Sequence, residues 1–72
     1  MRKYFDNLPN SQIQHLIYEY IHSKRDREIM KYTLIDGQTS EWIAEKYDMN
    51  TRTIQRIIAR YLIRLSNAAN KS

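Results

Sequence analysis

The sequence predicts an all-α protein, a compact four-helix domain that contains a helix-turn-helix. One Gly and one Pro among 72 residues leave little material for the turns of β-hairpins. The apolar residues recur at spacings of three and four, which is the period of an amphipathic helix. Two such helical patterns meet at the segment "YDMN", residues 47–50. We expect one helix-turn-helix domain over residues 1–66 and a frayed C-terminal tail over residues 67–72.

The first predicted helix lies in "LPNSQIQHLIYEYIHS", residues 8–23. Pro9 suits its first turn, because proline has no amide hydrogen to leave unsatisfied there. The apolar side chains of this segment fall on one stripe of a helix. They are Ile13, Leu16, Ile17, Tyr20 and Ile21.

A second helix is predicted to begin after Ser23, which with Asp26 three residues later resembles a capping box. The helix continues through an apolar stripe that consists of Ile29, Met30, Thr33 and Leu34. Gly37 follows as a residue that can end the helix with a positive φ.

The third and fourth helices are predicted to be "SEWIAEKY", capped by Thr39 or Ser40, and a segment from Thr51 to about Leu65, capped by Asn50. A helix-turn-helix requires a shared apolar seam and a tight turn between these helices. Asp48 holds the turn position usually taken by Gly, and Asp tolerates left-handed backbone better than most residues. We expect the seam to bury Ile43, Ala44, Met49, Ile54 and Ile57.

Charge divides the chain unevenly. Residues 1–48 contain seven Lys or Arg and eight Asp or Glu, whereas residues 49–72 contain five Lys or Arg and no acid. On the fourth helix Arg52, Arg56 and Arg60 fall opposite the apolar stripe, at successive steps of four. A positive face concentrated on one element is typical of a protein that binds nucleic acid. The alternative is an ordinary solvated helix face.

The segment from Arg25 to Leu65 resembles region four of bacterial sigma factors, the tetrahelical domains of LuxR-type response regulators, and small sigma-like proteins of Firmicute prophages. The resemblance is carried by an "R-x-R-E-hydrophobic" opening at residues 25–29, "DG-x-T" at 36–39, "IAE" at 43–45, the "TRTIQRI" segment at 51–57 and the closing "RL" pair at 64–65. It implies a DNA-binding helix-turn-helix.

Carried onto matching positions, the resemblance implies DNA contacts from Thr51, Arg52, Gln55 and Arg56, with Thr53 and Arg60 near phosphates. Helix geometry adds Arg64, which lies beyond the reach of base edges and is expected to meet phosphate. Two residues depart from the family pattern. Trp42 stands where the family usually has a charged residue, and Thr51 stands where sigma factors often have Arg. The other sigma domains are absent, so a stand-alone regulator is the more natural interpretation.

Some residues keep two interpretations. Trp42 either packs against the first helix or anchors a partner. Tyr4 and Phe5 either pack beneath the first helix or form a dimer contact. Ile63 is either a lone exposed apolar side chain or part of a dimer or partner interface.

Double-stranded DNA is the predicted partner, and a transcriptional regulator of phage or prophage type is the predicted function. A homodimer is expected, because one helix-turn-helix covers only a short half-site. The alternative is a protein-interaction module that binds RNA polymerase or a host defence complex. The sequence contains no Cys and no convergent set of catalytic groups, so neither enzyme activity nor a metal or other cofactor is expected. A bacterial cytoplasmic or nucleoid location is predicted, since no apolar run has the length of a membrane span.

Overall fold

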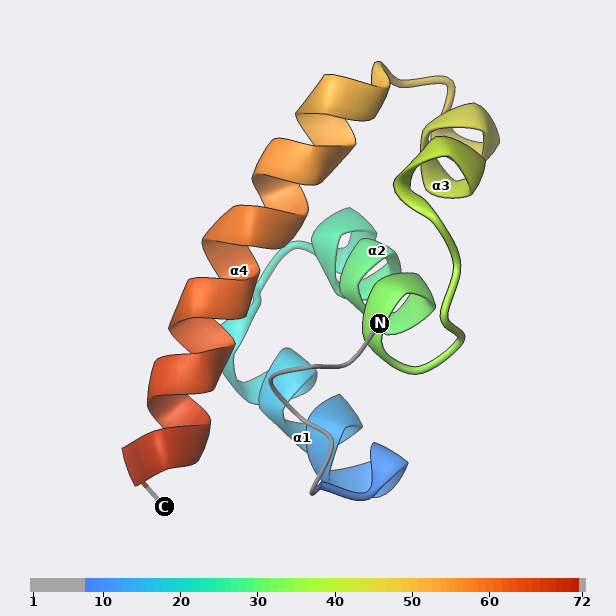
Figure 1. Cartoon of the computed structure of the whole chain (residues 1–72). Helices are drawn as coiled ribbons and strands as arrows, with labels where there is room; N and C mark the ends of the chain where they lie inside the picture. Colours follow the sequence, from blue (N-terminus) through green and yellow to red (C-terminus); the bar gives the residue numbers. More distant parts are fainter. Residues whose placement is uncertain (1–7, 72) are drawn as a thin grey trace.

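The computed structural model describes residues 8–71, which form four α-helices and no strand. The helices are α1 (Asn10–Tyr20), α2 (Lys24–Leu34), α3 (Ser40–Tyr47) and α4 (Thr51–Lys71). The longest helix, α4, contacts each of the other three, whereas α1 and α3 do not contact each other. Figure 1 shows α4 running along one side of the molecule, with α1, α2 and α3 beside it. The predicted all-α class is confirmed for the described residues.

One hydrophobic core joins the four helices. Burying such side chains stabilises the domain by roughly 1.5–3 kcal/mol for each large aliphatic or aromatic residue, before the loss of chain entropy is counted. The buried residues of this core are Ile13, Leu16, Ile17, Ile21, Ile29, Met30, Leu34, Ile43, Ala44, Ile54, Ile57, Ile58, Tyr61 and Leu65.

The first helix follows its predicted pattern except at Tyr20. The amides of Gln12 and Ile13 donate to the carbonyl of Pro9, which makes the proline the N-cap just before the helix and not a residue of its first turn as predicted. Ile21 leaves the helix with extended backbone and is fully buried. Tyr20 is 40% exposed, because it is the last residue of α1 and lies beside the outer side chains of α4. Its predicted place in the buried stripe is therefore wrong.

The start of α2 is capped by Ser23, whose hydroxyl accepts a hydrogen bond of 3.3 Å from the amide of Asp26. The Asp26 carboxylate does not complete a capping box. Its Oδ1 accepts from the guanidinium of Arg25 at 3.0 and 3.1 Å, and its Oδ2 accepts from the hydroxyl of Tyr61 at 2.7 Å. Asp26 is 7% exposed, so these charge-assisted bonds compensate a nearly buried carboxylate.

We refer to residues 25–28, at the start of α2, as the RDRE segment. Each of its last three residues binds a different neighbouring helix. Asp26 accepts from Tyr61 of α4, and Glu28 accepts from the hydroxyl of Tyr47 of α3 at 2.7 Å. Arg27 donates to the carbonyls of Tyr18 and Ile21 at the end of α1, where helix carbonyls lack intrahelical partners. The segment thus fixes α1, α3 and α4 relative to α2.

The last helix is longer than predicted. The sequence pattern predicts an end near Leu65 and a frayed tail over residues 67–72, but α4 continues to Lys71. Alanine has the highest helix propensity, and Ala68 and Ala69 pack partly buried against the core. Both effects keep the chain helical past the predicted boundary.

Gly37 lies in the loop between α2 and α3 and has the predicted positive φ, at 72°. The helix ends three residues earlier, at Leu34, and the amide of Gln38 donates to the carbonyl of Tyr32 at 2.9 Å. A Cβ on Gly37 would meet nothing within 4 Å, so the backbone angle alone explains the glycine.

Replacing Tyr61 by Phe removes the donor to Oδ2 of Asp26 and leaves the ring in place. We expect the free energy of unfolding to fall by about 1.5–3 kcal/mol, the usual contribution of a hydrogen bond to a charged group. Urea denaturation followed by circular dichroism measures it. Tyr18→Phe is the matched control, because Tyr18 is 56% exposed and its hydroxyl makes no bond that the structure describes. Equal stability of the Tyr61→Phe variant and the parent would contradict the assigned bond.

The two bonded tyrosines also predict a loss of stability in alkali. The hydrogen bond to Asp26 and burial raise the pKa of Tyr61, and burial and the hydrogen bond to Glu28 raise the pKa of Tyr47. Because the folded chain then holds these protons more tightly than the unfolded chain, their contribution is complete below about pH 10 and is lost as the pH rises above it. Urea midpoints measured at increasing alkaline pH should fall, and they should fall less steeply in Tyr47→Phe and in Tyr61→Phe.

Candidate nucleic-acid interface

The helices α3 and α4 pack on each other across a short connection, residues 48–50. In Figure 1 α3 is seen almost end-on while α4 runs across the view, so their axes cross steeply. Four of the five predicted seam residues are buried. They are Ile43, Ala44, Ile54 and Ile57. The fifth, Met49, packs against the core but stays partly exposed, because it lies in the connection rather than on either helix.

The connection is a tight turn with left-handed backbone at Asp48, at φ 54° and ψ 47°. The amide of Met49 donates to the carbonyl of Ala44 at 2.8 Å, and the amide of Asp48 donates to the carbonyl of Glu45 at 3.3 Å. This pair of bonds is the Schellman arrangement at the end of a helix. It satisfies the last carbonyls of α3 and redirects the chain.

The first turn of α4 is capped as predicted. The side-chain oxygen of Asn50 accepts a 2.8 Å hydrogen bond from the amide of Arg52. At the start of α3, the hydroxyl of Thr39 accepts from the amide of Trp42 at 3.1 Å, which selects Thr39 over Ser40 as the cap. Both helices of the pair therefore begin at defined residues, and the direction of α4 is set by the turn and its caps.

The residues predicted to contact bases, together with Thr53, which is predicted to lie near phosphate, are grouped at the N-terminal end of α4. Arg52, Thr53, Gln55 and Arg56 are exposed and Thr51 is half-buried. They occupy the first two turns, over a rise of about 8 Å. The opposite side of these turns is buried in the core, so the polar side chains all face away from the domain.

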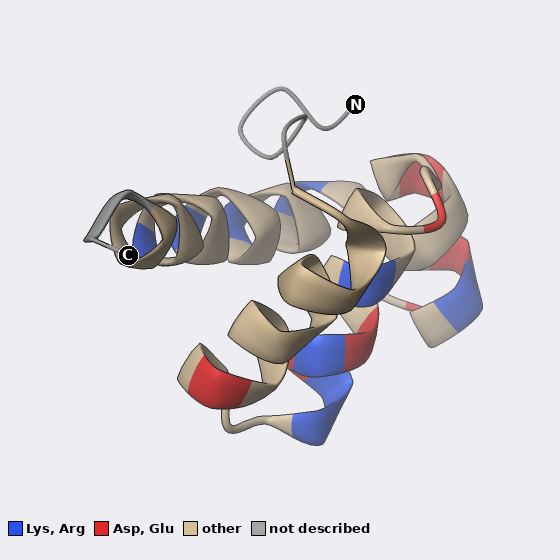
Figure 2. Cartoon of the chain, turned by 90° about the horizontal axis from the view of Figure 1, so that it is seen from below, with Lys and Arg blue, Asp and Glu red and all other residues tan. Residues whose placement is uncertain are grey.

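Positive charge along this face is not neutralised by the protein itself. The one ion pair in the described part of the chain joins Arg25 and Asp26. Figure 2 shows Lys and Arg positions repeating along α4, with no acid on that helix. The unpaired amides at a helix N-terminus add positive potential at the same end. The N-terminal end of α4 therefore presents a positive electrostatic potential to solvent.

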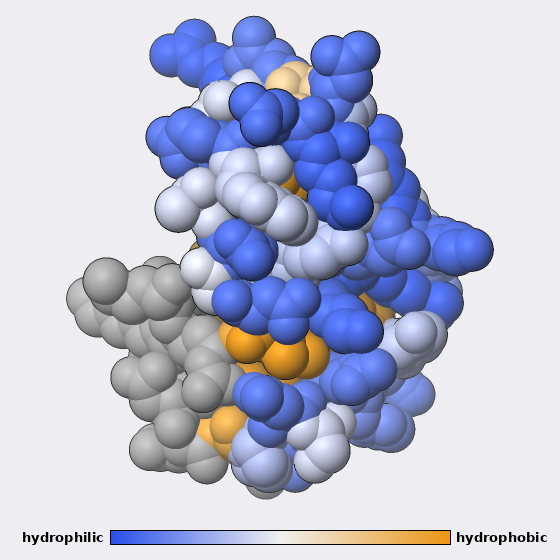
Figure 3. Space-filling model, turned by 90° about the vertical axis from the view of Figure 1, so that its right-hand side faces the viewer, coloured by the Kyte–Doolittle hydropathy of each residue, from blue (hydrophilic) through white to orange (hydrophobic). Residues whose placement is uncertain are grey.

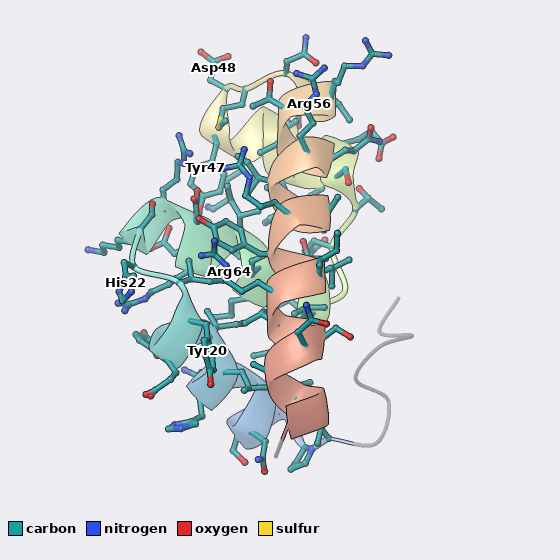
Figure 4. The ribbon with its side chains drawn as sticks, turned by 90° about the vertical axis from the view of Figure 1, so that its left-hand side faces the viewer. Tyr20, His22, Tyr47, Asp48, Arg56 and Arg64 are labelled. Atoms are coloured by element: carbon teal, nitrogen blue, oxygen red, sulfur yellow. The ribbon has the colours of Figure 1, made fainter. Side chains whose placement is uncertain are left out.

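The predicted phosphate-binding residues, Arg60 and Arg64, are exposed further along the same helix. The guanidinium of Arg64 lies 5.7 Å from the ring centroid of Tyr61. Figure 4 shows Arg56 near the end of α4 that adjoins the turn, and Arg64 further along, close to Tyr20. The two halves of the helix thus present arginine to different surroundings.

The residues predicted as possible partner or dimer contacts differ in their surroundings. Trp42 does not pack against α1. Its ring lies edge-on to Tyr32 of α2, with centroids 5.2 Å apart, and it remains 41% exposed. Ile63 is exposed as predicted, at 66%. Tyr4 and Phe5 lie outside the described residues.

Two residues that position this interface were not singled out from the sequence. Tyr47 and Tyr61 hold α3 and α4 on the RDRE segment through the bonds described above. A signal existed for Tyr61, because a tyrosine in a buried stripe needs a partner for its hydroxyl. The identity of that partner, 35 residues away in the chain, follows only from the tertiary structure.

No helix in the described part of the chain has the length and apolar character needed to cross a membrane. Among the same residues, no group of three or more His, Asp or Glu side chains is arranged to hold a metal ion. Comparison with protein-family models, with curated proteins and with solved structures finds no match to this chain.

Replacing Asp48 by Val tests the turn. A β-branched residue tolerates left-handed backbone poorly, and we expect a loss of about 1–2 kcal/mol in the free energy of unfolding. Asp48→Gly is the matched control and should leave stability within about 1 kcal/mol of the parent, because glycine adopts this conformation without strain. Thermal and urea denaturation measure both. Equal stability of the Val and Gly variants would contradict the left-handed turn.

Proposed function

We propose that the protein is a sequence-specific double-stranded DNA-binding regulator in which α3, the turn and α4 form a helix-turn-helix. The observation that carries this proposal is the exposed, uncompensated polar face of the first turns of α4, which holds Arg52, Gln55 and Arg56. A helix of this kind fits the major groove, which is about 12 Å wide. The tight Asp48 turn and the buried seam support the same assignment, since they hold α4 at an angle to α3.

The polar side chains of α4 match a division of labour on DNA. Arg52 and Arg56 lie where side chains reach base edges, and arginine binds guanine O6 and N7 with two hydrogen bonds. Gln55 has the amide geometry that reads adenine. Thr51 and Thr53 supply short hydroxyls beside them, with Thr53 close enough to the groove wall to meet phosphate.

Arg60 and Arg64 occupy later turns, where a straight helix leaves the floor of the groove. Their expected contact with DNA is the phosphate backbone, which positions the protein without reading sequence. Phosphate contacts make affinity depend on salt, because each one releases condensed counterions. The two halves of α4 are therefore distinguishable by measurement.

A protein-interaction module remains the rival function, with RNA polymerase or a host defence complex as the partner. The exposure of Trp42 and Ile63 favours it, since each is a large apolar side chain that solvent reaches. On this view the arginine face contacts an acidic protein surface. Duplex affinity then does not depend on the arginines of the first turns.

Alanine substitution of Arg56 and of Arg60 decides between the two functions. We expect Arg56→Ala to lower affinity for the preferred duplex by about 1–3 kcal/mol and to flatten preference at one base pair. Arg60→Ala should weaken all duplexes alike and reduce the salt slope by about one. The preferred duplex is first selected from a random pool, and fluorescence anisotropy at several salt concentrations then gives the affinities.

Gln14→Ala is the control, because Gln14 lies on α1 at a distance in the fold from the first turns of α4. Its affinity and salt slope should match those of the parent. Unchanged duplex affinity in both arginine variants would overturn the DNA-binding proposal in favour of the interaction module.

A further inference from the structure

A surface groove lies beside the second half of α4, away from the turn. It has a volume of about 590 Å³ and is lined by Tyr20, Arg60, Ile63, Arg64, Asn67 and Ala68. We refer to it as the α4 groove. Tyr20 and Ile63 are two of the four large hydrophobic side chains that the described chain leaves exposed. The groove therefore combines apolar side chains with two guanidinium groups.

The α4 groove contains no acid. Neither Arg60 nor Arg64 forms an ion pair within the described residues, although Arg64 also lies over the ring of Tyr61. Apolar surface bordered by unpaired cations is suited to an occupant with the reverse pattern, an apolar side chain bordered by carboxylates. That reverse pattern is present on α3.

The outer face of α3 carries Glu41, Trp42 and Glu45, which we refer to as the α3 ridge. All three are exposed, and neither glutamate forms an ion pair within the described residues. One side of the Trp42 ring is covered by Tyr32, and the amine of Lys46 lies 5.8 Å from its centroid, which leaves 41% of Trp42 exposed. The ridge is thus an aromatic side chain beside two acids that lie one helical turn apart.

Ridge and groove match in spacing as well as in charge. Glu41 and Glu45 are four residues apart on a helix, and so are Arg60 and Arg64. Each pair therefore spans about 6 Å along its helix axis. Two helices laid side by side can then face both carboxylates with both guanidinium groups, while Trp42 covers Ile63.

The two surfaces cannot meet within one molecule. In Figure 1 α3 and the C-terminal half of α4 lie on opposite sides of the fold, and α3 does not contact α1, whose end forms one wall of the groove. Figure 3 shows that the side carrying α3 is mainly hydrophilic, so a partner there is selected largely by charge.

We propose that the α3 ridge of one copy docks in the α4 groove of a second copy. The contact is head-to-tail, because each copy keeps a free ridge at one end and a free groove at the other. Heterologous contacts of this kind extend into rows or close into rings. A twofold contact through the α4 groove is disfavoured, since it brings four arginines together without an acid.

The contact is tested first without DNA, so that its outcome is independent of the proposed DNA binding. Sedimentation equilibrium at low ionic strength should give a weight-average mass that rises above 8.8 kDa with concentration. The mass should return towards the monomer at about 0.5 M salt, where attraction between exposed charges is screened. Glu45→Lys and Arg64→Glu should each weaken association at least tenfold.

Matched controls make the same charge changes elsewhere. Asp36→Lys alters an exposed acid outside the ridge, and Arg52→Glu alters an exposed arginine outside the groove. Both should associate like the parent. Circular dichroism of every variant should show the same helix content, which separates a lost contact from a lost fold.

Mixing two double variants gives the sharpest result. Arg60→Glu/Arg64→Glu keeps a native ridge, and Glu41→Lys/Glu45→Lys keeps a native groove, so neither associates alone. An equal mixture should associate again, because the native ridge of the first variant fits the native groove of the second, and the reversed Lys ridge of the second faces the reversed Glu groove of the first.

A parent that stays monomeric at millimolar concentration and low salt would overturn the proposal. So would a mixture of the double variants that stays monomeric, or association that persists in Glu41→Lys/Glu45→Lys alone. The last result would show that the copies associate without the carboxylates of the α3 ridge.

Discussion

The arrangement of this domain depends on two carboxylates at the start of α2. Asp26 accepts the hydroxyl of Tyr61 and Glu28 accepts the hydroxyl of Tyr47, so α4 and α3 are each held on α2 by one short bond of 2.7 Å. Hydrophobic burial is not directional and tolerates sliding of one helix on another. Hydrogen bonds are directional, so these two bonds oppose sliding of α3 and α4 on α2, and the buried bond to Asp26 is the better shielded of the two. Arg25 makes this arrangement tolerable, because it partly neutralises an acid that would otherwise be buried alone.

These bonds also fix the orientation of the candidate interface, because the interface and Tyr61 lie on the same helix, α4. Tyr61 lies near the middle of the helix, and the buried seam with α3 lies near its start. A helix held at both places cannot pivot, so the polar side chains of its first turns keep one orientation relative to the domain. A protein that reads base edges benefits from such rigidity, because less conformational entropy is lost when it binds.

Preferences that depend on residues close in sequence predict most of the fold. They do not predict contacts between residues that are distant in sequence. The caps at Ser23, Thr39 and Asn50 and the left-handed backbone of Asp48 depend on neighbours within a few positions, and the structure confirms each of them. The partners of Tyr47 and Tyr61 lie 19 and 35 residues away, beyond any periodicity. The apolar stripe predicts an end of α4 near Leu65, whereas tertiary packing of two alanines continues the helix beyond it. The exposed arginine row was predictable, since it is the complement of the buried stripe on one helix.

The two proposed roles of α4 meet at Arg60. On DNA its guanidinium is expected to contact phosphate, and in a row of copies it faces a carboxylate of the neighbouring α3 ridge. One guanidinium can serve both anions only if they approach its fork from different sides. Arg64 is also expected to meet phosphate, but it lies one turn further from the DNA-proximal end and borders the same groove, so in a row of copies it can hold the neighbour while Arg60 holds the phosphate. The negative DNA and the negative ridge of an adjacent copy therefore compete at both arginines, and less at Arg64 than at Arg60. The helix continues past Arg64 because Ala68 and Ala69 pack against the core, and Ala68 completes the lining of the α4 groove.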